Sequence, residues 1–304
     1  MVRYIIKRVI LAIVTVLLIC IITFFLMNAV PGGPFNREKA LSEATVQALN
    51  ERYNLDKPII VQFGLYMKNI ILYGDFGVSL KNGREITTII AESFPISCKI
   101  GLLAVSIALV LGTILGSIAA LMRNRWPDRV IIFLSTLFTA VPSFILATLL
   151  LLIFSIKLGW FPVWSANEVS YVLPVAALCA YPMAYTTRLA KTSMLDALSQ
   201  DYIRTARAKG VKKWKIIFKH ALRNSLLPII TYAGPEIAYI ITGSMVVETV
   251  FTIGGIGSKF VSAIGNRDYT MIMATTIFLA VLMVFANLIC DLLYKVVDPR
   301  IKYD

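Results

Sequence analysis

The stretch DYIRTARAKGVKKWKIIFKHALRNSLLP, residues 201–228, carries eight lysine or arginine residues and one acidic residue. It lies between two long apolar segments, residues 171–187 and 226–250. An apolar segment of about 20 residues is long enough to cross a bilayer as a helix. We therefore interpret residues 188–223 as a basic loop between two membrane spans, and this interpretation decides the fold class.

The composition as a whole is typical of a membrane protein. Of the 304 residues, 58% are hydrophobic and only 15% are charged, and the mean hydropathy is +0.77. Soluble domains have about a quarter of their residues charged. The cysteines are widely spaced and His220 is the one histidine, so the sequence predicts neither a metal centre nor a disulfide framework.

Six segments are predicted to form membrane-spanning helices. The fourth is short and contains Pro174 and Pro182, so we expect it to pack against protein rather than lipid. The first follows the basic segment MVRYIIKR but is longer than the core of a signal peptide, which favours an uncleaved helix. The expected spans are Val9–Ala29, Ser97–Met122, Val130–Ile156, Tyr171–Thr187, Leu226–Val250 and Thr270–Tyr294.

The distribution of charge predicts the orientation of these spans. The N-terminus, residues 123–129, residues 188–223 and the C-terminal tail with Asp291 hold 19 Lys/Arg and 6 Asp/Glu, whereas the rest of the chain holds 11 of each. The net charge of +13 therefore lies on one side, which the positive-inside rule assigns to the cytoplasm. We expect both termini to be cytoplasmic. Because this rule alone makes cytoplasmic loops basic, charge by itself identifies no partner.

An insert at residues 31–95 is expected on the extracytoplasmic side, as a small cap on the membrane surface. Residues 41–52 are one expected helix, and residues 56–58, with an acidic N-cap and an early proline, mark the start of another. The sequence GDFG (74–77) lacks the other motifs of a kinase, and GGIG (254–257) lacks the setting of a nucleotide-binding loop. We predict turns or tight loops at both places.

Two helices are expected within the basic stretch. RTARAKG is a helix-favouring run that Gly210 closes. After Gly210, six apolar side chains follow three- and four-residue spacing while lysines occupy the other positions, which is typical of an amphipathic helix on the inner membrane surface. These apolar residues are Val211, Trp214, Ile217, Phe218, Ala221 and Leu222.

The residues alone leave two interpretations of this stretch open. It is either a docking surface for a cytoplasmic protein or a helical loop that only binds anionic lipid. A helix-turn-helix nucleic-acid module is the weaker hypothesis, because the segment is too short to supply a third helix and a core of its own.

Glu236 is the informative residue of the fifth expected span. It lies ten residues into the segment, about 15 Å deep at 1.5 Å per residue, and a carboxylate at that depth marks a functional site by default. The alternative is a paired or protonated glutamate that fixes an interface. Pro142 should kink the third span. The candidate pathway residues are Tyr232, Glu236, Tyr239, Gly243 and Pro142, where the tyrosines and the glycine share the Glu236 face by helical spacing.

The sequence resembles the membrane subunits of bacterial ABC importers, specifically the first permease subunit of the oligopeptide, dipeptide and nickel group. The resemblance covers nearly the whole chain and rests on VPGGPF (30–35), YNLDKPIIVQF (53–63), GDFGVS (74–79), SFPIS (93–97), VPSF (141–144), DYIRTARAKG (201–210), TGSMVVETVF (242–251) and GNRDY (265–269).

The resemblance implies an all-α polytopic membrane protein with six transmembrane helices and the type I ABC importer fold. The expected division is a first helix (1–30), the extracytoplasmic insert (31–95) and a core of five transmembrane helices (96–304). The core contains a cytoplasmic coupling loop at residues 188–225.

A role for the basic stretch also follows from the resemblance. The family motif begins Glu-Ala-Ala; here Arg204 and Thr205 replace its first two residues, Ala206 and Gly210 are retained, and Arg223 replaces the final proline. In this family the loop is a coupling helix that docks in a groove of the ATPase. The implied coupling residues are Arg204, Thr205, Ala206, Arg207, Ala208, Lys209 and Gly210.

The implied function is that of an oligopeptide importer permease that forms half of the translocation pathway by alternating access. The implied partners are a second permease, two ATPases that hold ATP and Mg²⁺, and an extracytoplasmic peptide-binding protein, all in a bacterial cell membrane. This chain has no P-loop and needs no cofactor. A dipeptide or nickel importer is the alternative within the group. A membrane sensor or an intramembrane enzyme is the alternative outside it, but the sequence supplies no catalytic companion for Glu236.

Overall fold

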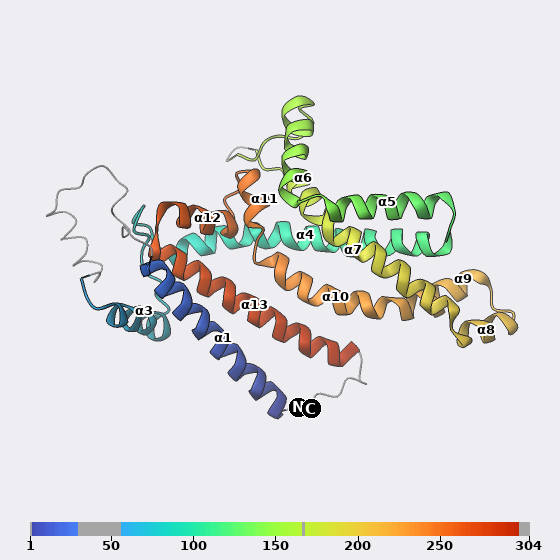
Figure 1. Cartoon of the computed structure of the whole chain (residues 1–304), viewed down its shortest axis with the longest axis horizontal. Coiled ribbons are helices and arrows are strands. Elements are labelled where there is room, and N and C mark those ends of the chain that lie inside the picture. Colours follow the sequence, from blue (N-terminus) through green and yellow to red (C-terminus); the bar gives the residue numbers. More distant parts are fainter. Residues whose placement is uncertain (1, 30–55, 166–167, 298–304) are drawn as a thin grey trace. The chain divides into compact units, whose positions relative to one another are not determined.

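The computed structural model describes residues 2–29, 56–165 and 168–297 (Figure 1). Every described element is a helix, and these residues pair as β structure only at one isolated bridge, between Val78 and Glu85. The expected helix at residues 41–52 and the motif VPGGPF lie outside the described residues.

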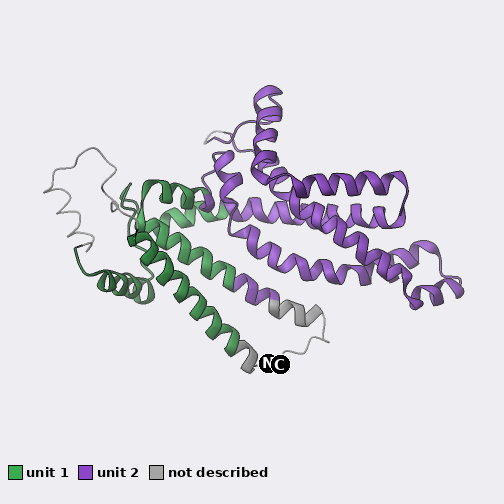
Figure 2. Ribbon diagram, viewed as in Figure 1, with its two compact units in different colours: residues 1–95, 258–284, 303–304 green, residues 96–257, 285–302 purple. Residues whose placement is uncertain are grey.

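The chain divides into two compact units (Figure 2). The first unit takes its described residues from 1–95 and 258–284, and the second takes them from 96–257 and 285–302. Both units draw on the long helices α4 (Ile86–Leu121) and α13 (Tyr269–Val297). Because α4 begins at Ile86, the expected boundary at residue 95 falls inside a continuous helix.

The first unit is built on an apolar contact between α1 and α13. Cys20 and Phe24 of α1 are buried with Met273 and Ile277 of α13. The second helix expected in the insert is present as α3, but it begins after Pro58, which makes no side-chain cap, and not at Asp56. Besides parts of α4 and α13, the helices of this unit are α1 (Val2–Ala29), α3 (Ile59–Tyr73) and most of α12 (Ile256–Asn266).

Both glycine motifs outside the expected spans form turns, as predicted. Gly74 ends α3 in the left-handed conformation, with a φ of 63°, and Gly77 has a φ of 80°. Gly254 and Gly255 lie in the loop between Val250 and Ile256.

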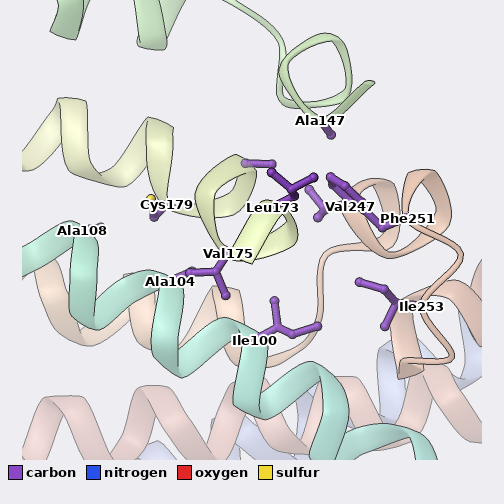
Figure 3. Close-up of a cluster of buried hydrophobic side chains, with 11 residues drawn as sticks. Ile100, Ala104, Ala108, Ala147, Leu173, Val175, Cys179, Val247, Phe251 and Ile253 are labelled. Carbon is purple, nitrogen blue, oxygen red and sulfur yellow. The ribbon is translucent and has the colours of Figure 1, made fainter. Parts of the chain in front are cut away.

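The second unit contains the remaining helices. Its apolar core joins α4, α6, α7 and α11, and Figure 3 shows Ile100 of α4 next to Val175 of α7 in this cluster. Gly116 lets α4 approach α7 closely, because a Cβ atom there would lie 2.3 Å from the carbonyl oxygen of Thr187. These helices are α5 (Trp126–Ala140), α6 (Ser143–Leu150), η1 (Leu151–Lys157), α7 (Val172–Ser199), α8 (Asp201–Ala208), α9 (Lys213–Lys215), η2 (Ile216–Leu222), α10 (Arg223–Ile241) and α11 (Met245–Val250).

The third expected span is broken rather than kinked. Its two halves, Trp126–Ala140 and Ser143–Lys157, meet at an angle of 103°. Val141 ends the first half in an extended conformation, and Pro142 caps the second. Proline favours an extended conformation in the residue before it, which explains why the helix stops here.

The fifth expected span, Leu226–Val250, lies within one candidate membrane span, Lys213–Val250, and its helix is interrupted near the end. Helix α10 ends at Ile241, and Gly243 adopts a φ of 91° that interrupts the helix before α11 begins. Only glycine reaches a φ in that region easily, so the presence of glycine at position 243 explains the break.

Among the described residues, four helices are long and apolar enough to cross a membrane, and the broken pair makes a fifth candidate. The four are Ile6–Ala29, Ile86–Leu121, Lys213–Val250 and Tyr269–Cys290. The fourth expected span, Tyr171–Thr187, lies in the 28-residue helix α7, which is less apolar than these. The structure therefore shows an all-helical membrane protein with four or five candidate spans.

The basic stretch folds into α8, a turn at Gly210 and a second helical segment, as predicted. Gly210 has a φ of 72° and its N–H donates to the carbonyl of Arg207, which is the expected helix stop. The second segment, however, is not a regular amphipathic α-helix. It begins as α9, where Trp214 is exposed, and continues as the π-helix η2, in which Ile216 and Ala221 are buried and Phe218 is exposed.

Candidate functional site

A cavity of about 780 Å³ lies in the second unit, between the break in the third span and the break in the fifth. Its walls come from the α5–α6 junction, the middle of α7, the end of α10 and the turn into α11. Four of the five predicted pathway residues line it, namely Pro142, Glu236, Tyr239 and Gly243. The two helix breaks therefore shape one hollow.

The cavity wall is mostly apolar and aromatic, with hydroxyl groups at intervals. Among the residues that line it, Glu236 alone has a charged side chain. Tyr239 is 67% exposed and Tyr181 is 52% exposed, so both residues are available to a ligand. The arrangement suits a solute with polar groups and one positive charge.

Tyr232, the fifth predicted residue, is not part of this wall. It lies one helical turn before Glu236 on α10, and its ring packs against Tyr185 of α7 at 4.5 Å between centroids. Tyr232 therefore belongs to the contact between α7 and α10 and not to the cavity surface.

Several lining residues were not predicted from the sequence. Tyr181 and Pro182 come from α7, and Thr139 and Ser143 flank the break at Pro142. A signal for the α7 pair was present, because a proline inside a span is tolerated where the helix borders protein or a water-filled space.

A buried carboxylate behind the cavity was also missed. Glu248 of α11 is only 2% exposed, and Ser97 of α4 donates a hydrogen bond of 2.7 Å to it. A Cβ atom on Gly243 would lie 2.8 Å from this carboxylate, so Glu248 packs directly behind the turn that lines the cavity. The two residues are 151 positions apart in the sequence, so no local sequence pattern predicts this contact.

The predicted coupling residues divide between an exposed face and a buried one. Six of the seven are exposed, but Ala206 is only 8% exposed and packs with Met194, Ile203 and Ile216. Ala206 therefore faces the protein's own core and not a partner surface. The exposed six are Arg204, Thr205, Arg207, Ala208, Lys209 and Gly210.

Helix α7 connects the cavity to the basic stretch. It contributes Tyr181 and Pro182 to the cavity wall, continues to Ser199 and is followed after one residue by α8. Near this end Lys191 pairs with the buried carboxylate of Asp128, on α5, at 2.5 Å. Helix α7 therefore leads from the cavity to the start of the basic stretch, and an ion pair joins it to α5.

Two family models match the chain. Residues 112–303 match the binding-protein-dependent transport system inner membrane component, and residues 1–101 match the N-terminal region of binding-protein-dependent transport system membrane components. The first match covers most of the second unit, including the cavity and the basic stretch.

Full-length relatives carry the same assignment. The chain is 45% identical to the dipeptide transport system permease protein DppB of Bacillus subtilis, over 99% of this chain and 98% of the relative. It is 42% identical to the oligopeptide transport system permease protein OppB of Haemophilus influenzae, over the whole of both chains. The resemblance inferred from the motifs is confirmed.

Solved structures support the fold. An inward-facing structure of the MetNI methionine ABC transporter aligns with a TM-score of 0.58 at 16% identity, over 69% of this chain and 97% of that one. An amino acid ABC transporter structure aligns with a TM-score of 0.56, over 69% and 94%. The chain therefore belongs to the binding-protein-dependent transport system inner membrane components, as a multi-pass transport subunit of the inner membrane and not an enzyme.

Proposed function

We propose that this chain is a permease subunit of an ATP-driven peptide importer and forms half of its translocation pathway. The observation that carries the proposal is the full-length identity of 45% and 42% to a dipeptide and an oligopeptide permease. Both relatives are named for peptides, which favours peptide over nickel as the solute. Because one is a dipeptide and the other an oligopeptide permease, peptide length stays open between these two.

The cavity is the proposed binding surface of the pathway. The Glu236 carboxylate accepts a hydrogen bond from the protonated amino terminus of a peptide. The exposed residues Tyr181 and Tyr239 contact the side chains of that peptide. The hydroxyl groups of Thr139 and Ser143 form transient hydrogen bonds with the peptide backbone as the peptide moves through the pathway. Rings and hydroxyls of this kind recognise features that all peptides share, which suits a pathway that must pass many sequences.

Helix α8 is the proposed contact with the ATPase. Arg204 and Arg207 are exposed on it, whereas Ala206 and Ile203 anchor its other face to the core of the second unit. Movement of a docked ATPase would pass from α8 into α7, which reaches the cavity. A helix of 28 residues is about 42 Å long, enough to cross the hydrocarbon core of a bilayer.

The proposed topology has six spans and cytoplasmic termini. It counts α7 as the sixth span, because its buried face and its internal Pro182 suit a helix that crosses the membrane against protein. The proposed partners are a homologous second permease that completes the pathway, two ATPases that hold ATP and Mg²⁺, and an extracytoplasmic peptide-binding protein. Membership of a binding-protein-dependent family supports the last two kinds of partner.

ATP-driven uptake by the purified complex tests the proposal. Detergent extraction of the tagged chain should recover a second permease and two ATPases. Proteoliposomes that contain this complex should accumulate a labelled peptide when ATP and the binding protein are supplied, and unlabelled peptide should compete whereas Ni²⁺ should not. Recovery of the chain without ATPases, or competition by Ni²⁺ alone, would overturn the assignment.

A further inference from the structure

Two exposed tryptophans lie at the same end of the second unit. Trp126 is 75% exposed at the start of α5, and Trp214 is 57% exposed in α9. Figure 1 places the α4–α5 turn and α9 at one end of this unit, and Ala120, near the end of α4, is buried in the same cluster as Ile216 of η2. Large rings left this exposed need a partner surface.

The π-helix η2 explains why the rings near Trp214 are not buried. In a π-helix the hydrogen-bonded residues are five apart, so Ile216 and Ala221 fall on one face, and both are buried. Trp214 and Phe218 then lie away from this face, and Phe218 is 64% exposed. The local helix geometry therefore turns an aromatic pair outward while its neighbours hold the segment to the core.

Basic side chains surround both tryptophans. We name two patches: the α4–α5 patch, comprising Arg123, Arg125, Trp126 and Arg129, and the α9–η2 patch, comprising Lys212, Lys213, Trp214, Lys215, Phe218 and Lys219, all of them exposed.

The acidic residue nearest in sequence to the first patch, Asp128, is buried and paired with Lys191, which lies outside the patch. Its carboxylate is buried and accepts from Lys191 and from the backbone N–H of Asn124. The side chain of Lys215 lies over the ring of Trp214, with 5.6 Å from its Nζ to the ring centroid. Each patch therefore combines an aromatic ring with a cationic rim.

We infer that these two patches bind anionic phospholipid of the bilayer surface, with the rings at the depth of the glycerol esters and the cations on the phosphates. The α4–α5 patch follows the candidate span Ile86–Leu121, and the α9–η2 patch lies at the N-terminal end of the candidate span Lys213–Val250. Tryptophan is enriched at this depth of a membrane, and basic residues beside a span attract anionic headgroups.

The proposed lipid surface is distinct from the coupling face of α8. The exposed coupling residues include Arg204 and Arg207 but no tryptophan or phenylalanine. The basic stretch thus serves two surfaces, with α8 free for a protein and the α9–η2 patch on lipid. This division does not depend on which solute the importer carries.

Fluorescence quenching by brominated lipid tests the insertion of the rings. The complete importer is placed in nanodiscs of phosphatidylcholine and phosphatidylglycerol, with bromine near the glycerol ester in all of the lipid. The parent should lose part of its tryptophan emission, and both Trp126→Phe and Trp214→Phe should remove a share of that loss. Trp164→Phe is the matched control, because Trp164 is partly buried against Tyr171 and should leave the quenching unchanged. Quenching that neither Trp126→Phe nor Trp214→Phe reduces, as when a partner subunit covers the rings, overturns the inference.

A second arm tests the preference for anionic lipid. Bromine is placed on phosphatidylglycerol alone or on phosphatidylcholine alone at equal content, and stronger quenching by the first reports enrichment. Lys213→Gln with Lys215→Gln should lower this enrichment, by about fivefold for each lysine removed. Lys259→Gln, an exposed lysine of α12, should change nothing. Equal quenching by both lipids in the parent contradicts the preference.

Discussion

Ser97 and Glu248 hold three segments of the second unit together. The Ser97 hydroxyl donates to the Glu248 carboxylate at 2.7 Å and accepts from the backbone N–H of Ile256 at 2.9 Å. Gly255 makes room for this carboxylate, because a Cβ atom there would lie 2.4 Å from its Oε2 atom. A buried carboxylate is costly unless its oxygens accept hydrogen bonds, so this contact fixes α4, α11 and the start of α12.

Removal of the Ser97 hydroxyl should therefore weaken the fold. Ser97→Ala removes one hydrogen-bond donor from the buried carboxylate of Glu248, and we expect a loss of about 1–3 kcal/mol. The thermal unfolding midpoint of the purified importer should fall. Ser106→Ala, at an exposed position of the same helix, is the control and should leave it unchanged. Equal midpoints for the two variants would mean that the contact is not formed.

Glu236→Gln should reduce peptide uptake without disturbing assembly. The substitution removes the negative charge of the cavity wall but keeps its shape. A charge-assisted hydrogen bond contributes about 1.5–3 kcal/mol, so uptake at low peptide concentration should fall at least about tenfold. Glu236→Asp keeps the charge and should retain part of the activity. Unchanged uptake by Glu236→Gln at several pH values would assign the residue to structure alone.

Substitutions on the two faces of α8 should have different effects. Arg207→Glu reverses an exposed charge, so we expect loss of uptake with normal thermal stability and altered ATP hydrolysis. Ala206→Trp overfills a buried position beside Met194, and we expect reduced folding yield. Paired measurements of uptake, ATP hydrolysis and melting separate the outcomes. If Arg207→Glu transports normally, α8 is not the coupling element.

The ion pair between Lys191 and Asp128 should contribute to stability because it is largely buried. Asp128→Ala leaves the ammonium group of Lys191, which is 22% exposed, without its partner, and we expect a cost of about 3 kcal/mol. Glu92→Ala breaks the exposed Arg84–Glu92 pair and should cost less than about 1 kcal/mol.

The exchange Asp128→Lys with Lys191→Asp provides the check on that pair. It restores opposite charges and should recover part of the lost thermal stability. Variants at Asp128 and Glu92 that melt at the same temperature would show that burial does not strengthen the first pair.

The sequence predicts the residues of the cavity wall better than the buried contact between Ser97 and Glu248 that packs behind it. Pro142 and Gly243 break helices by their own backbone chemistry, and Glu236 is conspicuous because a charge in an apolar segment is costly. These local signals identify three parts of the cavity wall. Glu248 is a charge of the same kind, but its meaning depends on Ser97 in a distant helix, and that pairing appears only in the fold.

The π-helix marks another limit of prediction from sequence. The spacing of Trp214, Phe218 and Ala221 predicts one apolar face of a regular amphipathic helix on the inner membrane surface. Packing of Ile216 and Ala221 against the second-unit core instead imposes a five-residue period. Helix period is set here by tertiary contacts, so the burial of Ala221 apart from the exposed Phe218 could not be predicted from residue spacing.

The most direct test of the account blocks the cavity during transport. In a variant whose native cysteines are replaced by alanine, Ser143→Cys presents a thiol at the exposed cavity wall, and Thr87→Cys presents one at an exposed position that is not among the lining residues. Each complete importer is labelled with a bulky maleimide and reconstituted, and ATP-driven peptide uptake is measured. We predict that labelling at residue 143 abolishes uptake and that labelling at residue 87 does not. Full uptake after complete labelling at residue 143 would contradict the claim that peptide passes through this cavity.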